Sequence, residues 1–158
     1  MPREHAAFTN APPPPILTMS TRSWNRRADI GRPEETETHS VEALRLSPRD
    51  TMAYTWMTYA GLAGFILGGY EQAGAWFRRA IEANRNYPLA HFGLAAALAQ
   101  LGRLDEARST VTTGLALNPT FTVTRARALW TATSSGPTYL RGLEPAFEGL
   151  RNAGVPEK

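Results

Sequence analysis

The sequence LGGYEQAGAWF, at residues 67–77, recurs in a related form as LGRLDEARSTV, at residues 101–111. The two copies align without a gap, and their Leu-Gly steps place Gly68 and Gly102 34 residues apart. One further step of the same length reaches Gly136, within the sequence SSGP. A fixed period of this length predicts repeated structural units that stack on one another.

The chain from Val41 onward is rich in Ala and Leu, and its turn signals are Gly-Gly, Asn-Tyr-Pro, Asn-Pro and Ser-Ser-Gly-Pro. Every long segment between these turns suits a helix, because no alternation of apolar and polar residues persists. Gly68 and Gly102 suit the left-handed conformation that ends a helix, and Pro88 and Pro119 suit a first helical turn. The sequence therefore predicts an all-α fold.

The period of 34 residues, together with the residue types at fixed positions inside it, resembles the tetratricopeptide repeat family. Small residues at these positions let paired helices approach closely, while large apolar ones fill the space between them. The first copy has Met57, Ala60, Gly61, Gly64, Ala73, Phe77 and Ala80, and the second has His91, Leu94, Ala95, Leu98, Ala107, Val111 and Gly114. Residues 42–48 resemble the end of a preceding repeat's second helix.

The resemblance implies an all-α, right-handed solenoid of helical hairpins with about two and a half repeats and a C-terminal capping helix. Residues 1–40 are expected to form a disordered tail, because they are polar, contain four consecutive prolines and lack apolar periodicity. The expected repeat domain spans residues 41–136. We place a partial repeat at residues 41–50, full repeats at residues 54–87 and 88–121, and a degenerate third repeat at residues 122–153.

Residues 137–158 are expected to form a cap and a tail. The segment begins like a helix, with a proline in its first turn. Apolar residues then recur at helical spacing, so one face should pack on the solenoid; they are Tyr139, Leu140, Leu143, Phe147 and Leu150. Pro145 is expected to kink or divide this helix, because proline lacks an N–H group and its ring clashes with the preceding turn.

The stretch TMAYTWMTYAGLAGFILGGY, residues 51–70, contains no charged residue. A membrane span needs about 20 predominantly apolar residues, and the threonines, tyrosines and Gly-Gly pair dilute this one. The counterpart in the next repeat, residues 86–102, also lacks Asp, Glu, Lys and Arg. This segment is too short and too rich in Ala to span a membrane. We therefore expect residues 51–70 to form the first helix of a full repeat and not a membrane span.

In tetratricopeptide proteins the first helices of successive repeats line a concave groove that binds extended or helical peptides. The resemblance, carried over by register, implies a set of predicted groove residues: Thr55, Thr58, Tyr59, Leu62, Phe65 and Ile66, then Leu89, Phe92, Ala96, Ala99 and Gln100. None is charged, so the expected partner is an apolar peptide or an amphipathic helix. The alternative is that these side chains are buried under a neighbouring repeat or under the C-terminal segment.

The composition narrows the possible functions. The 158-residue chain has no cysteine, which excludes disulfides, thiolate metal sites and a cysteine nucleophile and is compatible with a reducing cytoplasm. Its net charge of +3 is small and dispersed, so nucleic acid is not an expected partner. No motif for catalysis, phosphate binding or metal binding occurs, and we expect His91 to be a packed side chain. The prediction is a non-catalytic protein-interaction module with no cofactor and no metal.

Two further interpretations concern the context of the chain. Residues 121–145, FTVTRARALWTATSSGPTYLRGLEP, resemble the end of rhizobial-type proteins that join a class III adenylate cyclase domain, or a winged-helix regulator, to terminal tetratricopeptide repeats. On that interpretation the chain is the accessory C-terminal fragment of a signalling protein. About three repeats are needed for a stable solenoid, so either the flanking partial repeats complete the stack or a homodimer covers its open end.

Overall fold

The structure, a computed structural model, describes residues 33–46, 49–132 and 136–158. These residues form seven helices and no strand, which confirms the predicted all-α class. The helices are α2 (Pro33–Leu46), α3 (Ala53–Ile66), α4 (Tyr70–Ala83), α5 (Pro88–Gln100), α6 (Leu104–Leu117), α7 (Val123–Thr131) and α8 (Pro137–Asn152).

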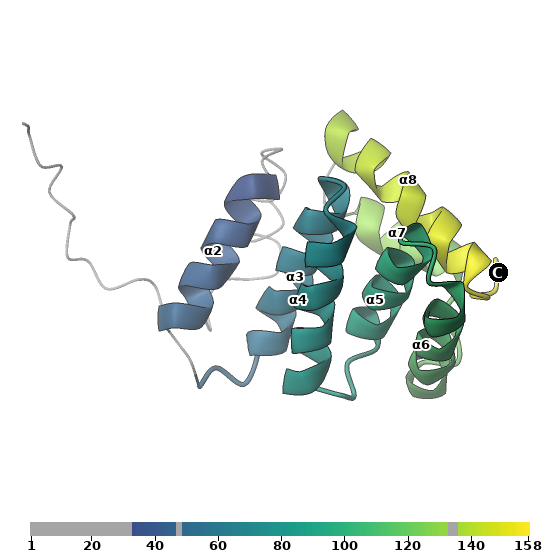
Figure 1. The fold of residues 1–158 in the computed structure, drawn as a ribbon, viewed down its shortest axis with the longest axis horizontal. Helices are drawn as coiled ribbons and strands as arrows, with labels where there is room; N and C mark the ends of the chain where they lie inside the picture. The colour runs from purple at the N-terminus through teal and green to yellow at the C-terminus, as the bar shows by residue number, and fades with distance from the viewer. Residues whose placement is uncertain (1–32, 47–48, 133–135) are drawn as a thin grey trace, which may run out of the picture.

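Two helical hairpins form the centre of the molecule (Figure 1). The first hairpin pairs α3 with α4 and the second pairs α5 with α6, while α4 also packs on α5 and so joins the two. On the N-terminal side, α2 packs on α3 as the second helix of a preceding unit would. This is the stacked arrangement of helical hairpins that the 34-residue period predicts.

The first helices of the two full repeats end in the same backbone geometry. Gly68 follows α3 with φ of 82°, and Gly102 follows α5 with φ of 76°. Glycine suits these left-handed values because it has no Cβ atom. The hydrogen bond that closes each end is also equivalent, at 2.9 Å from the N–H of Gly69 to the carbonyl of Gly64 and from that of Arg103 to that of Leu98.

Gly136, the third glycine of the period, does not share this geometry. It precedes α8 with φ of −62°, so it lies before a helix and does not close one. The reason is the length of α7, which has nine residues whereas α3 has 14. The positive φ of the C-terminal region is found instead at Gly154, at 98°, just after α8.

Helices pack closely, both within and between the two hairpins, where a glycine faces an aromatic ring. A Cβ atom at Gly61 or Gly93 would lie 2.8 Å or 2.4 Å from Cε1 of Phe77, and one at Gly114 would lie 2.9 Å from the ring of Phe92. These distances are shorter than carbon atoms can adopt without movement of the ring. The rings therefore require the small residues predicted at positions 61 and 114, and Gly93 serves the same purpose.

The first described helix begins earlier than the predicted repeat domain. α2 begins at Pro33, whereas that domain was placed from Val41 onward. The sequence before Val41 is polar and carries no apolar stripe to mark a helix. Ser40 is nevertheless fully buried, and its hydroxyl donates a 2.8 Å hydrogen bond to the carbonyl of Thr36. The remainder of the predicted tail, residues 1–32, lies outside the described residues.

The last helix, α8, packs against the first helices of both full repeats and lies at the C-terminal side of the molecule (Figure 1). It packs mainly on α5 and makes smaller contacts with α3 and α7. Pro145 lies inside α8, so the predicted division of the helix at this residue does not occur. Leu143 and Phe147, on either side of Pro145, are fully buried and hold both halves of α8 against the solenoid.

Candidate functional site

The predicted groove residues lie on α3 and α5, and four of them are buried. Thr58, Phe65, Phe92 and Ala96 have exposed fractions of 9% or less. The ring of Phe92 also stacks on that of Phe121, with centroids 3.7 Å apart. These side chains contribute to close-packed regions of the core, so they offer little surface to a partner.

The other predicted groove residues are partly exposed. They are Thr55, Tyr59, Leu62 and Ile66 on α3, and Leu89, Ala99 and Gln100 on α5. Neither helix contains Asp, Glu, Lys or Arg. An uncharged face of this kind can contact the apolar side chains of a partner, but it has no charge with which to form an ion pair.

A pair of tyrosines lies at the N-terminal ends of these two helices. Tyr54 is in the first turn of α3 and Tyr87 precedes α5, and their ring centroids are 4.7 Å apart. Burial, with smaller contributions from Tyr59 and Tyr54, raises the pKa of Tyr87 to about 12. Burial also raises the pKa of Tyr59. Both hydroxyl groups are protonated at neutral pH, as those of ordinary tyrosines are, and can donate hydrogen bonds.

The C-terminal ends of α3 and α5 are covered by α8. The residues beneath it are all predicted groove residues, and we name them the α8 seat: Ile66, Ala96, Ala99 and Gln100. Nε2 of Gln100 donates a 2.7 Å hydrogen bond to the carbonyl oxygen of Pro145. At these four residues the C-terminal segment lies on the predicted groove, which is the alternative arrangement that the sequence left open.

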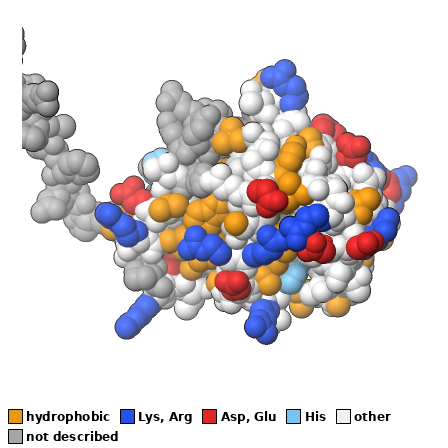
Figure 2. Space-filling view, in the orientation of Figure 1, with side chains coloured by type: hydrophobic (Ala, Val, Ile, Leu, Met, Phe, Trp, Pro, Cys, Tyr) orange, Lys and Arg blue, Asp and Glu red, His pale blue; other side chains and the backbone are white. Residues whose placement is uncertain are grey.

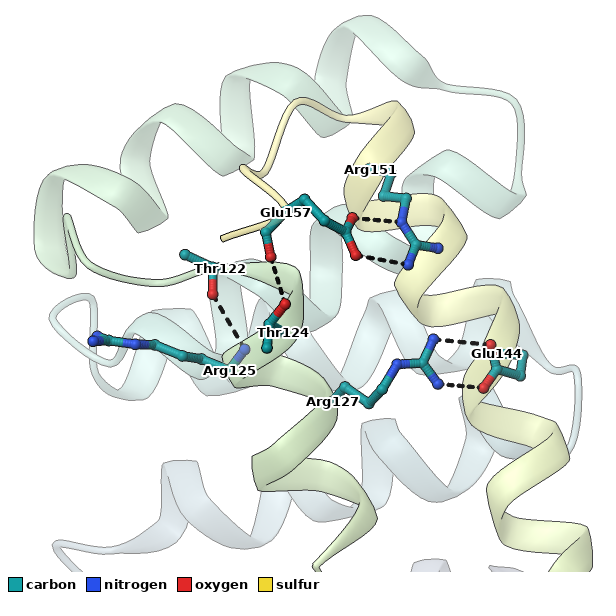
Figure 3. A network of polar contacts seen from close by, with 7 residues as sticks. All are labelled: Thr122, Thr124, Arg125, Arg127, Glu144, Arg151 and Glu157. Atoms are coloured by element: carbon teal, nitrogen blue, oxygen red, sulfur yellow. Dashed lines mark hydrogen bonds and ion pairs between the residues drawn. The ribbon is translucent and has the colours of Figure 1, made fainter.

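Ion pairs join α8 to α7 and to the chain that follows it (Figure 3). Arg127 of α7 makes two hydrogen bonds to the carboxylate of Glu144, and Arg151 makes two to that of Glu157. In each pair the arginine lowers the pKa of the carboxyl group. The guanidinium of Arg127 also lies 4.2 Å from the ring centroid of Phe147.

The residues after α8 also cap the N-terminus of α7. The N–H of Val123 donates to the carbonyl of Pro156 at 2.8 Å, and that of Thr124 donates to the carbonyl of Glu157 at 3.1 Å. N–H groups in the first turn of a helix have no partner within the helix, so the tail supplies the acceptors. The tail, α7 and α8 together form one cap at the C-terminal end of the solenoid.

Charge is dispersed over the molecular face seen in Figure 2. Arginine and carboxylate side chains are interspersed there with apolar ones, without a patch of one sign. Among the residues that the structure describes, no group of three or more His, Asp or Glu side chains could hold a metal ion. In the same part of the chain, no helix has both the length and the apolar character to cross a membrane.

Sequence reasoning did not identify the residues of α8 that meet the seat. Gly142 lies against Ile66, and Gly149 lies against Ala96 and Ala99. The signal was present, because two glycines seven residues apart lie on one face of a helix. What the sequence did not indicate was the helix that this face would meet.

The stacked hairpins and the uncharged face define a helical-repeat protein. A family model described as tetratricopeptide repeat matches residues 66–129, from the last residue of α3 into α7. This match supports a tetratricopeptide repeat protein, and such repeats suggest a protein–protein interaction module. The comparison with curated proteins gave no match. The resemblance to cyclase-linked or winged-helix proteins thus remains a prediction.

Proposed function

We propose that the chain is a non-catalytic interaction module that binds an apolar peptide or an amphipathic helix on the face of α3 and α5. The observation that carries this proposal is the absence of charged side chains from α3 and α5. The second of these helices lies within the section that matches a repeat family known for protein binding. Leu62 and Leu89 are the most suitable contact residues, because they are large, apolar and partly exposed.

A selection from a peptide-display library tests this proposal with the full chain. Selected peptides would be measured against the wild type, a Leu62→Glu/Leu89→Glu variant and a Leu117→Glu control, each checked for helix content by circular dichroism. Leu117 is an exposed leucine on α6, the second helix of its hairpin. A carboxylate in an apolar contact is expected to weaken binding at least tenfold.

The expected result is a set of apolar or amphipathic peptides that bind the wild type and the control and lose affinity for the double variant. Peptides that bind all three proteins equally would contradict the proposed face. Selected peptides whose contacts are mainly ionic would contradict the proposed chemistry of the partner.

A further inference from the structure

Three tyrosines lie between the N-terminal ends of α3 and α5. The rings of Tyr54 and Tyr87 are in contact, with centroids 4.7 Å apart and planes inclined by 60°. Tyr59 lies near them, because after burial it is the largest contributor to the raised pKa of Tyr87. All three side chains are partly exposed. We name these residues the tyrosine cluster, which presents aromatic surface to solvent.

Two hydroxyl groups of the cluster are available as hydrogen-bond donors. That of Tyr54 donates to Sδ of Met52 at 3.5 Å, and a thioether is a weak acceptor. That of Tyr87 has no hydrogen-bond partner among the residues that the structure describes. Neither α3 nor α5 contains a charged side chain. A ligand that suits the cluster therefore supplies acceptors and apolar rings, and it needs no charge.

A run of prolines has this chemistry. Proline has no N–H group, so each residue presents a carbonyl acceptor and an apolar ring. In the polyproline conformation the carbonyls make no internal hydrogen bonds, and the fixed φ lowers the entropy cost of binding. Grooves lined by aromatic side chains recognise such segments. A helix, in contrast, uses most of its carbonyls internally.

The chain contains one run of this kind, with four consecutive prolines at residues 12–15. No other two prolines in the sequence are adjacent. In the polyproline conformation, four residues complete one turn and extend over about 9 Å. The run is thus long enough to contact both rings of the pair formed by Tyr54 and Tyr87.

The length of the chain between this run and α2 allows it to reach the cluster. Pro15 precedes Pro33 by 18 residues, and an extended chain of that length covers about 60 Å. The 14 residues of α2 extend over only about 21 Å. Because α2 leads directly into α3 and packs on it, Tyr54 lies near the end of α2 that is remote from Pro33 (Figure 1).

We propose that the proline run at residues 12–15 docks on the tyrosine cluster of its own chain, with its rings on Tyr54 and Tyr87 and its carbonyls accepting hydrogen bonds from their hydroxyl groups. A tether of this kind gives the run an effective concentration on the order of millimolar. A separate proline-rich ligand must therefore compete with it. The inference goes beyond the proposed function and does not require a partner at Leu62 or Leu89.

NMR of the full chain, with ¹³C in the tyrosine rings, tests the docking. The comparison is with a four-serine variant that carries Pro12→Ser, Pro13→Ser, Pro14→Ser and Pro15→Ser. The ring signals of the tyrosine cluster are expected to differ between the two proteins. Those of the remaining tyrosines, Tyr70 and Tyr139, should not differ. Identical signals of the cluster in both proteins would overturn the inference.

A fluorescent peptide of residues 9–18 measures the affinity of the cluster for the run. In the four-serine variant no tethered run competes, so the peptide is expected to bind at least ten times more tightly than it binds the wild type. The same peptide with serine in place of its prolines is the control and should bind neither protein. Equal binding of the proline peptide by both proteins, or of both peptides by the variant, would contradict the inference.

A Tyr87→Phe substitution in the four-serine variant tests the hydroxyl group while it keeps the ring. The proline peptide is expected to bind about five times more weakly, as the loss of one hydrogen bond predicts. Tyr70→Phe is the matched control, because Tyr70 packs on Phe65 outside the cluster, and it should bind as the four-serine variant does. Equal affinities of these two variants would show that the hydroxyl of Tyr87 does not bind the run.

Dilution distinguishes docking within one chain from docking between two copies. A tethered run gives a tyrosine spectrum that does not depend on protein concentration. A spectrum that changes on dilution to that of the four-serine variant would assign the run to a second copy and overturn docking within the chain. The proposed function is tested separately, because the library peptides are compared through Leu62 and Leu89 and the docking is measured at the tyrosines.

Discussion

The side chain of Gln100 and the carbonyl of Pro145 join the end of α5 to the middle of α8 through a hydrogen bond of 2.7 Å. The two residues are 45 positions apart in sequence, so this bond exists only when α8 is in place. It is also a polar contact within an otherwise apolar seat. Gln100 is therefore a sensitive position at which to test the attachment of α8.

A Gln100→Ala substitution is expected to lower the free energy of unfolding by about 1 kcal/mol, the usual net contribution of one hydrogen bond. Urea unfolding followed by circular dichroism measures this change. Asn152→Ala is the control, because it removes an exposed side-chain amide from the last turn of α8. An equal loss in both variants would show that the bond to Pro145 contributes nothing specific.

The close approach of Gly93 to Phe77 predicts an unusual response to alanine. In most helix interiors, replacing glycine by alanine stabilises by about 1 kcal/mol. At position 93 the new Cβ atom would lie 2.4 Å from Cε1 of a buried ring, so we expect Gly93→Ala to destabilise by about 1–3 kcal/mol, as overpacking does. Thermal unfolding gives the sign directly.

Gly64→Ala provides the matched comparison, because its Cβ atom would meet nothing closer than 3.7 Å. This variant should be as stable as the wild type or more stable. Adding Phe77→Leu to Gly93→Ala should recover part of the lost stability, since the ring is the obstacle. If Gly93→Ala stabilises the protein as Gly64→Ala does, the ring of Phe77 does not limit the space at position 93.

The glycines that close α3 and α5 should respond to alanine for a different reason. Nothing lies within 4 Å of a Cβ atom at Gly68 or Gly102, but both residues have positive φ. An L-residue in that region costs about 1–2 kcal/mol, so Gly68→Ala and Gly102→Ala are expected to destabilise by similar amounts. Differential scanning calorimetry of both variants would measure this.

Gly69 is the natural control for these two positions. It is adjacent to Gly68 but has φ of −82°, and a Cβ atom there would lie 3.4 Å or more from its neighbours. Gly69→Ala is therefore expected to change stability by no more than about 0.5 kcal/mol. A loss at position 69 as large as that at position 68 would show that backbone conformation is not the cause.

The two hairpins are the part of the fold that the sequence predicts. The two hairpins follow from the 34-residue period, because Gly68 and Gly102 end equivalent helices and small residues at 61 and 114 face aromatic rings. Those contacts are local or between adjacent helices. A repeat pattern predicts contacts of this kind, because each repeat contacts only its neighbours. The predicted hairpins are present in the structure.

The placement of α8 and the accessibility of the face could not be predicted in the same way. α3 and α5 carry no charge on any side, so their sequences do not distinguish the core-facing side from the partner-facing one. Repeat register therefore predicts Phe65 and Phe92 as groove residues, whereas both are buried in the structure. The spacing of Gly142 and Gly149 indicates one packed face of α8, but only the three-dimensional arrangement places it on Ile66 and Ala96.

The attachment of the tail to α7 is expected to depend on pH through Glu157. Hydrogen bonding to Arg151 lowers the pKa of this carboxyl in the folded protein. A lowered folded-state pKa means that the ion pair stabilises the tail above the ordinary glutamate value of about 4.3 and that this contribution is lost as pH falls through the folded-state value. Exchange of the Val123 and Thr124 amides should therefore report increased opening of the tail below about pH 4.3, after correction for the intrinsic pH dependence of exchange.

A Glu157→Gln substitution separates this ion pair from general acid effects. The variant lacks the titrating group, so protection of the Val123 and Thr124 amides should be lower at neutral pH and nearly independent of pH in the acid range. Glu106→Gln removes a similar exposed pair with Arg103 and should leave these two amides as they are in the wild type. Added salt should reduce the difference between Glu157→Gln and wild type, because exposed ion pairs are screened. Identical pH profiles for Glu157→Gln and the wild type would show that the backbone hydrogen bonds to Pro156 and Glu157 hold the tail without help from Arg151.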